Sequence, residues 1–362
     1  MSQPKYKVGI IGATGMVGQR FITLLHDHPW FDITVLAASA RSAGQCYGDT
    51  VKGRWFMKDP LPQDVAEMTV YDASLVEEVA SRADFVFCAV NMPKDQIRSL
   101  EEAYARTETP VVSNNSAHRG TPDVPMMVPE INSDHCEVIE HQKKRLGTSR
   151  GFIAVKPNCS IQGYVPAITP LLSYGPEKIS VCTYQAISGA GKTFETWPEM
   201  VDNVIPFISG EEEKSEKEPL KIWGRVENGV IVPAEKPVIS AQCYRVAASD
   251  GHMAAVSVSF ARKPEKEEIL RLWSEYEGLP QKLHLPSAPQ RFLTYFDEDA
   301  RPQTRLDRDL YGGMGVSVGR LREDSIFDYK FVSLSHNTLR GAAGGAVLTA
   351  ELLCALGHIV NK

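Results

Sequence analysis

The glycine-rich turn near the amino terminus constrains the fold of this chain more than any other segment. The apolar run "YKVGIIG" ends at Gly12, and "MVGQRFITLLHDH" follows with apolar residues at helical spacing. Glycines between a strand and a helix allow a tight turn and a close approach to a pyrophosphate, which then lies on the free N–H groups of the helix. The segment therefore predicts a dinucleotide-binding turn, with a purely structural turn as the alternative.

The rest of the chain shows two patterns. Near-continuous apolar strands ("FDITVLAAS", "MTVYDAS", "DFVFCAV") alternate with the helical patterns "LVEEVASRA" and "KDQIRSLEEAYART", which is typical of a parallel sheet covered on both faces. Beyond about residue 156, longer strand-like runs such as "KISVCTYQAIS" and "GHMAAVSVSFAR" indicate an α+β region. The apolar stretch "TLRGAAGGAVLTAELLCALGHIV" predicts a terminal helix that returns to the first domain. We predict an α/β fold with a Rossmann-type parallel-sheet nucleotide domain and a second, α+β domain.

Composition narrows the class of protein and of partner. The 362 residues are 43% hydrophobic and 23% charged, as in ordinary globular proteins of two domains. A net charge of −6 without a long basic run argues against nucleic acid or an anionic membrane as partner. Neither a signal-peptide layout nor a run of about 18 apolar residues occurs, so we expect a cytoplasmic protein. Seven scattered cysteines without a CxxC pair indicate neither a disulfide framework nor a metal site.

The end of the second predicted strand indicates which dinucleotide is bound. NAD-selective domains usually carry an acidic residue there for the ribose 2′-hydroxyl, whereas this chain has "LAASARSAGQ", with Ser39, Arg41 and Ser42. An arginine flanked by hydroxyl groups suits a 2′-phosphate. The sequence favours NADP, with an exposed loop arginine as the alternative.

The run "VKPNCSIQG" places Cys159 before a segment with helical pattern. Most cysteines are buried filler, but a helix amino terminus lowers a thiol pKa, and its free N–H groups can hold an oxyanion. A cysteine nucleophile beside a nicotinamide indicates an oxidoreductase for aldehydes or acyl phosphates that works through a thioester. Arg245 and His252 flank the short loop of "CYRVAASDGH" and could converge on one substrate, the arginine through its carboxylate-binding fork.

Six blocks in order carry a family resemblance: "GATGMVG", "NCS", "TYQAISGAGK", "GEEEK", "RVAASDGH" and "HNTLRGAAGG". The chain resembles the aspartate-semialdehyde dehydrogenases over almost its whole length, and is most similar to their archaeal and fungal branch. The resemblance implies NADPH-dependent conversion of L-aspartyl-4-phosphate to aspartate semialdehyde, on the route to lysine, threonine, methionine and diaminopimelate. It implies an NADP-binding domain of residues 1–156 and 338–362, a catalytic and dimerisation domain of residues 157–337, and a homodimer or homotetramer.

The resemblance also implies roles for individual residues. Cys159 would be the nucleophile, His252 the general acid/base, and Gln185 the residue that orients the acyl intermediate. Arg245 would bind the substrate carboxylate, Glu211 its amino group, and Lys214 and Arg119 its phosphate, although Glu212 and Glu213 are alternatives to Glu211. The cofactor would contact Gly12, Thr14, Gly15, Met16, Val17, Ser39, Arg41, Ser42, Ser188, Gly189 and Asn337. Met253 stands after His252, where family members often have a small hydroxyl residue.

Three other functions fit parts of this pattern. A malonyl-CoA reductase or related acyl reductase would use the same fold, cysteine and histidine, but malonyl-CoA has no amino group for Glu211 to bind. N-acetyl-glutamyl-phosphate reductase shares the chemistry, but the "TYQAISGAGK" and "GEEEK" blocks fit it poorly. A redox sensor that binds the nucleotide without turnover is the alternative from a different class. A purely structural protein would leave these blocks unexplained.

Overall fold

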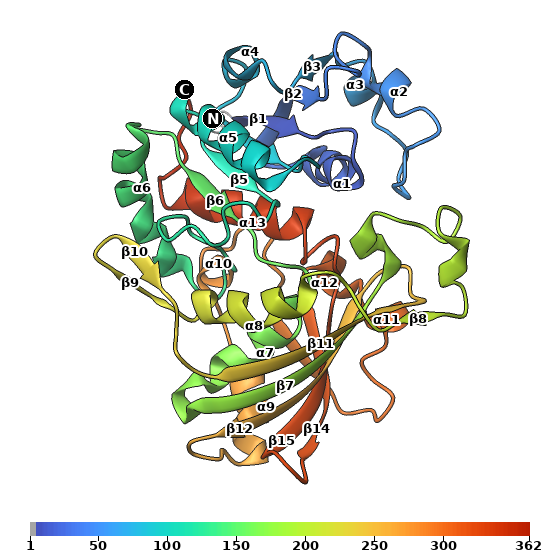
Figure 1. Cartoon of the computed structure of the whole chain (residues 1–362), viewed down its shortest axis with the longest axis vertical. Coiled ribbons are helices and arrows are strands. Elements are labelled where there is room, and N and C mark those ends of the chain that lie inside the picture. The colour runs from blue at the N-terminus through green and yellow to red at the C-terminus, as the bar shows by residue number, and fades with distance from the viewer. Residues whose placement is uncertain (1–4) are drawn as a thin grey trace.

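Two sheets organise the chain in a computed structural model that describes residues 5–362. The first is a six-stranded parallel sheet in the order β3-β2-β1-β4-β5-β6, and the second is a seven-stranded mixed sheet in the order β13-β14-β15-β12-β7-β11-β8. Figure 1 shows the parallel sheet in the upper part of the molecule and the mixed sheet in the lower part. The predicted α/β fold, with a Rossmann-type sheet and a second α+β unit, is confirmed.

The parallel sheet follows the predicted alternation of strands and helices. Its strands are fully or largely buried apolar runs, covered by helices on both faces. The strands are β1 (Tyr6–Ile11), β2 (Phe31–Ala38), β3 (Val70–Asp72), β4 (Phe85–Cys88), β5 (Val111–Ser113) and β6 (Ile153–Val155). The helices are α1 (Met16–Leu25), α2 (Tyr47–Thr50), α3 (Gln63–Ala66), α4 (Val76–Ala80), α5 (Lys94–Arg106), η1 (Ser133–Val138) and α6 (Ile139–Leu146).

The carboxyl-terminal helix α13 (Ala343–Ala355) lies beneath the parallel sheet in Figure 1 and packs against α1 and β5. Every residue from Ala343 to Cys354 is buried, as expected for a helix that is apolar around its whole circumference. The chain therefore returns to its first sheet, as we expected. The boundaries between the two domains, at residues 156–157 and 337–338, stay a prediction. The first four residues of the predicted NADP-binding domain lie outside the described part of the chain.

The mixed sheet has one covered and one open face. Residues of α7 (Tyr164–Ile168), α8 (Glu211–Ile222) and α9 (Lys266–Glu275) pack into the core under the covered face. The strands are β7 (Pro176–Gln185), β8 (Val204–Ile205), β11 (Val238–Val246), β12 (His252–Phe260), β13 (Leu293–Phe296), β14 (Val316–Glu323) and β15 (Tyr329–Ser335). A hairpin of β9 (Arg225–Glu227) and β10 (Val230–Val232) and the short helices α10 (Leu279–Lys282), α11 (Thr304–Asp307) and α12 (Leu310–Gly313) complete the second unit.

Neighbouring strands β11, β7 and β12 alternate between these two faces, except at the start of β7, where Glu177 and Lys178 are both exposed or half-buried. Their inward residues are buried, whereas their outward residues are exposed or half-buried. The outward residues in the middle of the open face are uncharged: Ser180, Cys182, Tyr184, Ser240, Gln242, Tyr244, Met253 and Ala255. Within residues 5–362, no element covers this uncharged middle of the open face.

Candidate active site

Three polar side chains meet at one end of the covered sheet face. Arg245 at the end of β11 is in register with Gln185 at the end of β7, and His252 begins the antiparallel neighbour β12. All three side chains are buried. His252 Nε2 lies 3.5 Å from Cys159 Sγ, so the strand ends bring the sequence-predicted histidine, glutamine and arginine to the sequence-predicted cysteine.

Cys159 lies on a loop between β6 and a 3₁₀ turn, η2 (Ser160–Gln162). The prediction of one helix beginning at Cys159 is wrong, because η2, α7 and a second 3₁₀ segment, η3 (Thr169–Tyr174), divide the stretch. Pro166 and Pro170 have no backbone N–H and cannot continue a regular hydrogen-bond ladder. Cys159 is therefore the residue before a 3₁₀ turn rather than before one regular α-helix.

The loop is held instead by Asn158 and two glutamates of α8. Asn158 N–H donates to Glu218 Oε2 at 2.6 Å, and its side-chain amide donates to Glu211 Oε1 at 3.0 Å. Asn158 Oδ1 accepts the backbone N–H of Ser160 at 2.7 Å. The residue before the nucleophile thus fixes the loop on both sides, a role that the quoted "NCS" block did not predict.

Electrostatics around the thiol differ from our expectation. Burial raises the pKa of the Cys159 thiol, and the Glu211 carboxylate raises it further, while Lys156, Arg119 and Arg245 act in the opposite direction. The expected lowering of this pKa is therefore wrong for the protein alone, because desolvation outweighs the nearby cations. Lys156, which the sequence analysis missed, is 3% exposed, and burial lowers its pKa to about 7.

The orientation of the His252 ring limits what it can do with a proton. The backbone N–H of Ala186 donates to Nδ1 at 3.1 Å, so the neutral ring carries its proton on Nε2, the atom that faces Sγ. Burial, with a smaller contribution from Arg245, lowers the pKa of His252 to about 3. In this geometry the ring is a hydrogen-bond donor toward sulfur, and it could accept the thiol proton only after losing the Ala186 contact.

The glutamate nearest the nucleophile is Glu211. Its Oε1 accepts from Lys214 Nζ at 2.7 Å, and its Oε2 accepts from Gln185 Nε2 at 3.3 Å. Glu212 instead accepts the N–H of Cys243 at 3.3 Å, and Glu213 pairs with Lys217 on the surface. Of the three candidates, only Glu211 points toward the cysteine.

Gly189 closes over the same site. A Cβ built on this glycine would lie 2.8 Å from Arg245 Nη1 and 3.0 Å from His252 Nε2. The neighbouring Ser188 Oγ accepts from Asn337 Nδ2 at 2.8 Å, and Asn337 Oδ1 accepts the N–H of Gly251 at 2.8 Å. Ser188, Gly189 and Asn337 therefore lie around the turn that presents His252.

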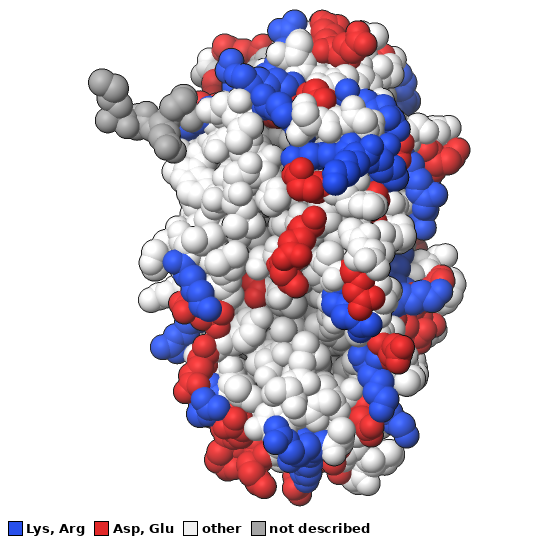
Figure 2. All heavy atoms as spheres, turned by 90° about the vertical axis from the view of Figure 1, so that its left-hand side faces the viewer, with Lys and Arg blue, Asp and Glu red and all other residues white. Residues whose placement is uncertain are grey.

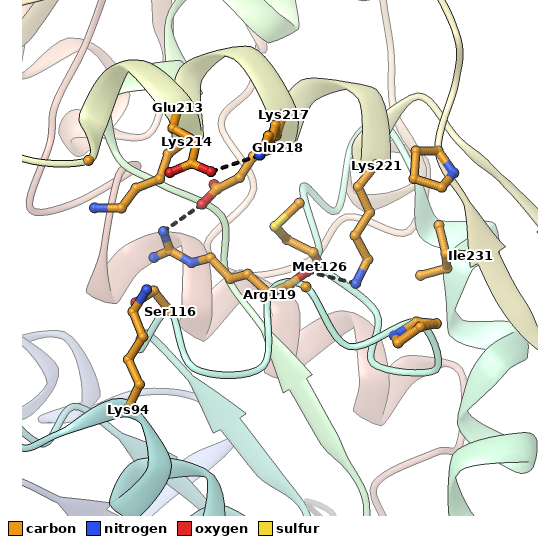
Figure 3. A pocket seen from close by; sticks show the side chains of 14 residues that line it. Lys94, Ser116, Arg119, Met126, Glu213, Lys214, Lys217, Glu218, Lys221 and Ile231 are labelled. Carbon is orange, nitrogen blue, oxygen red and sulfur yellow. Dashed lines mark hydrogen bonds and ion pairs between the residues drawn. The ribbon is translucent and has the colours of Figure 1, made fainter.

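Arg119 and Lys214 lie apart from Cys159, on a cavity of about 440 Å³ under α8 (Figure 3). Arg119 Nη1 contacts Glu218 Oε1 at 3.0 Å, and its Nε donates to the carbonyl of Lys156 at 2.9 Å. Glu218 thereby connects Arg119 to the nucleophile loop through Asn158. Both predicted phosphate ligands face this cavity, and neither contacts the thiol directly.

The glycine turn opens onto a second cavity, of about 760 Å³, at the carboxyl ends of the parallel strands. Five of the predicted cofactor residues line it: Gly12, Thr14, Gly15, Ser39 and Arg41. Met16 and Ser188 line a smaller cavity of about 200 Å³, whereas Val17 packs against the apolar core and Ser42 lines neither cavity. The turn and the end of β2 therefore bring five of the eleven predicted cofactor residues to one cavity.

Close packing requires glycine within the turn itself. Gly12 has a φ of +90°, and a Cβ there would lie 2.5 Å from the carbonyl oxygen of Ala89. A Cβ on Gly18 would lie 2.3 Å from the Gly12 carbonyl oxygen. The helix thus approaches the strand as closely as a dinucleotide-binding turn requires, and these residues fit a bound dinucleotide.

Three further features of the described residues are surface charge, the grouping of metal-ligating side chains and helix length. Figure 2 shows one side of the molecule, on which acidic and basic side chains are interspersed and leave the lower centre uncharged. Among residues 5–362, no three His, Cys, Asp or Glu side chains group as a metal site. None of the helices in this range has both the length and the apolar character that a membrane crossing requires.

Comparison with known proteins identifies the family. The model described as "Semialdehyde dehydrogenase, NAD binding domain" matches residues 7–139, and "Semialdehyde dehydrogenase, dimerisation domain" matches residues 168–340. Aspartate-semialdehyde dehydrogenase from Methanothermobacter thermautotrophicus is 44% identical, over 96% of this chain and 98% of that protein. The Aspergillus fumigatus enzyme of the same name is 42% identical over 99% of both chains.

Solved structures agree with this assignment. The crystal structure of the Candida albicans aspartate-semialdehyde dehydrogenase with NADP has a TM-score of 0.88 and 39% identity, over 98% of this chain and 100% of that one. Aspartate-semialdehyde dehydrogenase II from Vibrio cholerae has a TM-score of 0.74 and 25% identity, over 97% of this chain and 99% of that one. The chain therefore belongs to the semialdehyde dehydrogenase family, among the aspartate-semialdehyde dehydrogenases of the archaeal and fungal type.

Proposed function

We propose that this protein converts L-aspartyl-4-phosphate to L-aspartate 4-semialdehyde with NADPH, in the branch toward lysine, threonine, methionine and diaminopimelate. The observation that carries the proposal is the 3.5 Å contact between Cys159 Sγ and His252 Nε2, at strand ends that also present Gln185 and Arg245. A cysteine nucleophile with an oriented imidazole is the arrangement that acyl transfer through a thioester requires.

The charges around the thiol match this substrate. Arg245 offers a guanidinium for the α-carboxylate, and Glu211 offers a carboxylate for the ammonium group. Lys214 and Arg119 are the cations for the phosphate, on the side of Glu211 and Glu218 that faces the 440 Å³ cavity. Glu211 disfavours malonyl-CoA, because that substrate has no ammonium group to compensate a buried carboxylate.

The chain's own groups would act in two stages. The Cys159 thiol loses its proton to solvent and its sulfur attacks the acyl carbon. The bond between that carbon and the phosphate oxygen breaks, and the leaving phosphate takes up a proton, which leaves a thioester on Sγ. Bound NADPH would supply the hydride that reduces this thioester, after which the carbon–sulfur bond breaks and Cys159 returns to the thiolate. Throughout, His252 Nε2–H donates first to sulfur and then to the carbonyl oxygen on which charge develops.

Turnover in the reverse direction tests the proposal. Purified protein, L-aspartate semialdehyde, NADP and phosphate should form NADPH, and the Cys159→Ala variant should form none. Turnover that does not depend on phosphate, or that occurs with malonyl-CoA instead, would support the acyl-CoA reductase alternative. Nucleotide binding by folded wild type without turnover of either substrate would support the sensor.

We also propose that the cofactor is NADP rather than NAD. Arg41 lines the 760 Å³ cavity beside Ser39, and β2 ends at Ala38 without an acidic residue following it. An Arg41→Ala variant should weaken NADP binding by about tenfold or more, as expected when a hydrogen bond between charged groups is lost, and leave NAD binding unchanged. Equal weakening of both would contradict a 2′-phosphate contact.

We propose that the open face of the mixed sheet is the subunit interface. The proposal is supported by the uncharged outward residues described above, by Tyr184 and Tyr244, whose rings stack 6.1 Å apart, and by the match of residues 168–340 to a dimerisation domain. A Tyr184→Glu variant should sediment as a smaller species than wild type, because it places a charge within an apolar interface. Unchanged sedimentation of this variant would place the interface elsewhere.

A further inference from the structure

The cavity under α8 in Figure 3 has walls from both units of the molecule. Lys94, the first residue of α5, belongs to the parallel-sheet side, and Lys214 belongs to α8 on the other side. In Figure 3 the Lys94 side chain extends from the lower edge toward Ser116 and Arg119, and the Lys214 side chain extends from above on the same side. Three cationic side chains from three segments therefore approach one end of the cavity.

The cavity is positively charged although the chain is acidic. Five cations (Lys94, Arg119, Lys214, Lys217, Lys221) line it against two carboxylates (Glu213, Glu218), whereas the chain as a whole carries −6. Such local excess of one sign in a concave surface concentrates counter-ions. The cavity is thus the place where the chain can hold a multivalent anion.

The other cations of the cavity already have protein partners. The Lys221 ammonium donates to the carbonyls of Arg119, Thr121 and Val124 at 2.7–2.9 Å, which makes it a structural clamp. Among the described residues 5–362, the ion pairs of the cavity engage Arg119, Lys214 and Lys217, and Lys94 is in none of them. Within residues 5–362, Lys94 and Lys221 are therefore the two cations of this cavity without a carboxylate partner, and Lys221 is already held by three carbonyls.

Lys94 also acts across the cavity. Glu213 on α8 has a carboxyl pKa that is lowered mainly by its partner Lys217, and the charge of Lys94 on the opposite wall lowers it further. Because Lys94 and Lys214 line the same cavity of about 440 Å³, an anion bound in it would face both walls. An anion bound here would replace mutual repulsion among Lys94, Arg119 and Lys214 with attraction.

We propose that Lys94 is a third cationic ligand for the phosphate group, supplied by the nucleotide-binding side and acting opposite Arg119 and Lys214. The inference rests on the proposed function, because it takes the anion to be the phosphate that the reaction releases or consumes.

Calorimetric titration with inorganic phosphate tests the proposal without turnover. In the presence of NADP, Lys94→Gln should bind phosphate about tenfold more weakly than wild type, as expected when a charge-assisted hydrogen bond is lost, and Lys94→Arg should retain most of the affinity. Lys144→Gln is the matched control: it removes the same charge from an exposed site on α6 and should leave the affinity unchanged.

Steady-state kinetics give the second readout. Lys94→Gln should raise KM for phosphate by a similar factor and change kcat little, because the side chain binds phosphate and does not take part in bond making. The proposal is overturned if Lys94→Gln binds phosphate as wild type does, if Lys144→Gln weakens binding equally, or if wild type binds no phosphate. Loss of the proposed function itself shows separately, as absence of Cys159-dependent NADPH formation.

Discussion

At the scale of single residues, the thiol of Cys159 lies in a field set by one carboxylate and three cations. Because burial raises its pKa, we expect iodoacetamide to alkylate Cys159 in the unliganded protein at a rate that still rises above pH ~8.5, the usual thiol value. Mass spectrometry of the Cys159 peptide measures this rate. A plateau below pH ~7 would show instead a thiolate formed at neutral pH.

The alkylation rate of Cys159 also measures how much the charge of Lys156 stabilises the thiolate. This lysine carries its charge below its pKa of about 7 and loses it above, so its help to the thiolate fades as the pH rises. At pH ~6, Lys156→Met should slow alkylation by about threefold, which corresponds to roughly half a pKa unit, and by pH ~9 the two proteins should agree. A constant ratio at every pH would mean that the substitution acts through packing rather than charge.

The His252 ring makes a second prediction at this scale. With Nδ1 accepting from Ala186 and a pKa of about 3, the ring should remain neutral, with its proton on Nε2, from pH 8 down to about pH 4. Nitrogen-15 NMR of histidine-labelled protein distinguishes the two neutral tautomers and the charged ring. A signal for the charged ring near pH 6 would contradict the assignment.

Sequence reasoning reached the residue types of this site but not their partners. Cys159, His252, Gln185 and Arg245 could be named because each stands in a quoted block. The last three lie at the same edge of one sheet, near the ends of β7 and β11 and at the start of β12. The pKa of the thiol could not be predicted, because it depends on Lys156 and on burial that only tertiary packing creates. Nor could a sequence assign the proton of His252, since a backbone N–H from another strand decides it.

At the scale of elements, α8 carries the polar side of the site on one face. Glu211, Ser215 and Glu218 are buried along it, at the spacing of successive helical turns. Pro219 lies inside the helix and cannot donate to the Ser215 carbonyl, which accepts from Tyr164 OH at 2.6 Å instead. That a proline makes this helix depend on a tyrosine from α7 could not be predicted from the sequence, because Tyr164 reaches Ser215 only through tertiary packing.

This dependence can be measured. Tyr164→Phe leaves the buried Ser215 carbonyl without a donor, so it should lower the free energy of unfolding by about 1–3 kcal/mol. Urea unfolding followed by fluorescence gives the value. Tyr174→Phe, which removes a contact to Glu268 on a half-buried side chain, is the matched control and should cost about 0.5 kcal/mol or less. An equal loss of unfolding free energy in both variants would show that the hydrogen bond to the Ser215 carbonyl does not contribute more than an ordinary surface contact.

At the scale of the whole molecule, one buried ion pair joins the end of the chain to its first half. Arg340, fully buried, donates to Glu130 at 2.6 and 2.9 Å and to the Met314 carbonyl. Removing one partner of such a pair leaves an uncompensated charge, so Arg340→Ala should cost about 3–5 kcal/mol of stability. Arg271→Ala, at an exposed pair with Glu268, should cost about 1 kcal/mol or less.

The double variant tests the reason for that cost. Arg340→Met with Glu130→Gln removes both charges, and it should be more stable than Arg340→Ala alone. Thermal unfolding of wild type, Arg340→Ala, Arg271→Ala and the double variant compares their stabilities. If the double variant is the least stable, the pair contributes through its hydrogen bonds to the fold rather than by neutralising a buried charge.

The global architecture was the part of this molecule best predicted from sequence. Alternating apolar strands and amphipathic helices indicate a parallel sheet because the pattern repeats over many residues, and the terminal helix α13 returned to that sheet as expected. Local interruptions were missed, such as the proline-broken segment after Cys159, because each depends on a few residues. The cavity under α8 was missed as well, since its walls come from segments far apart in the chain.

Helix α8 has a practical consequence for anyone who wants to redirect this catalyst. Its twelve residues hold the nucleophile loop through Glu218, line the cavity of about 440 Å³ through Lys214, and carry Glu211, the proposed partner of the substrate ammonium group. A library confined to this helix, with Glu218 retained to hold the nucleophile loop, can therefore explore acyl donors of different charge. Tyr164 would have to be retained in every member, since its hydroxyl donates the hydrogen bond to the Ser215 carbonyl that Pro219 cannot donate.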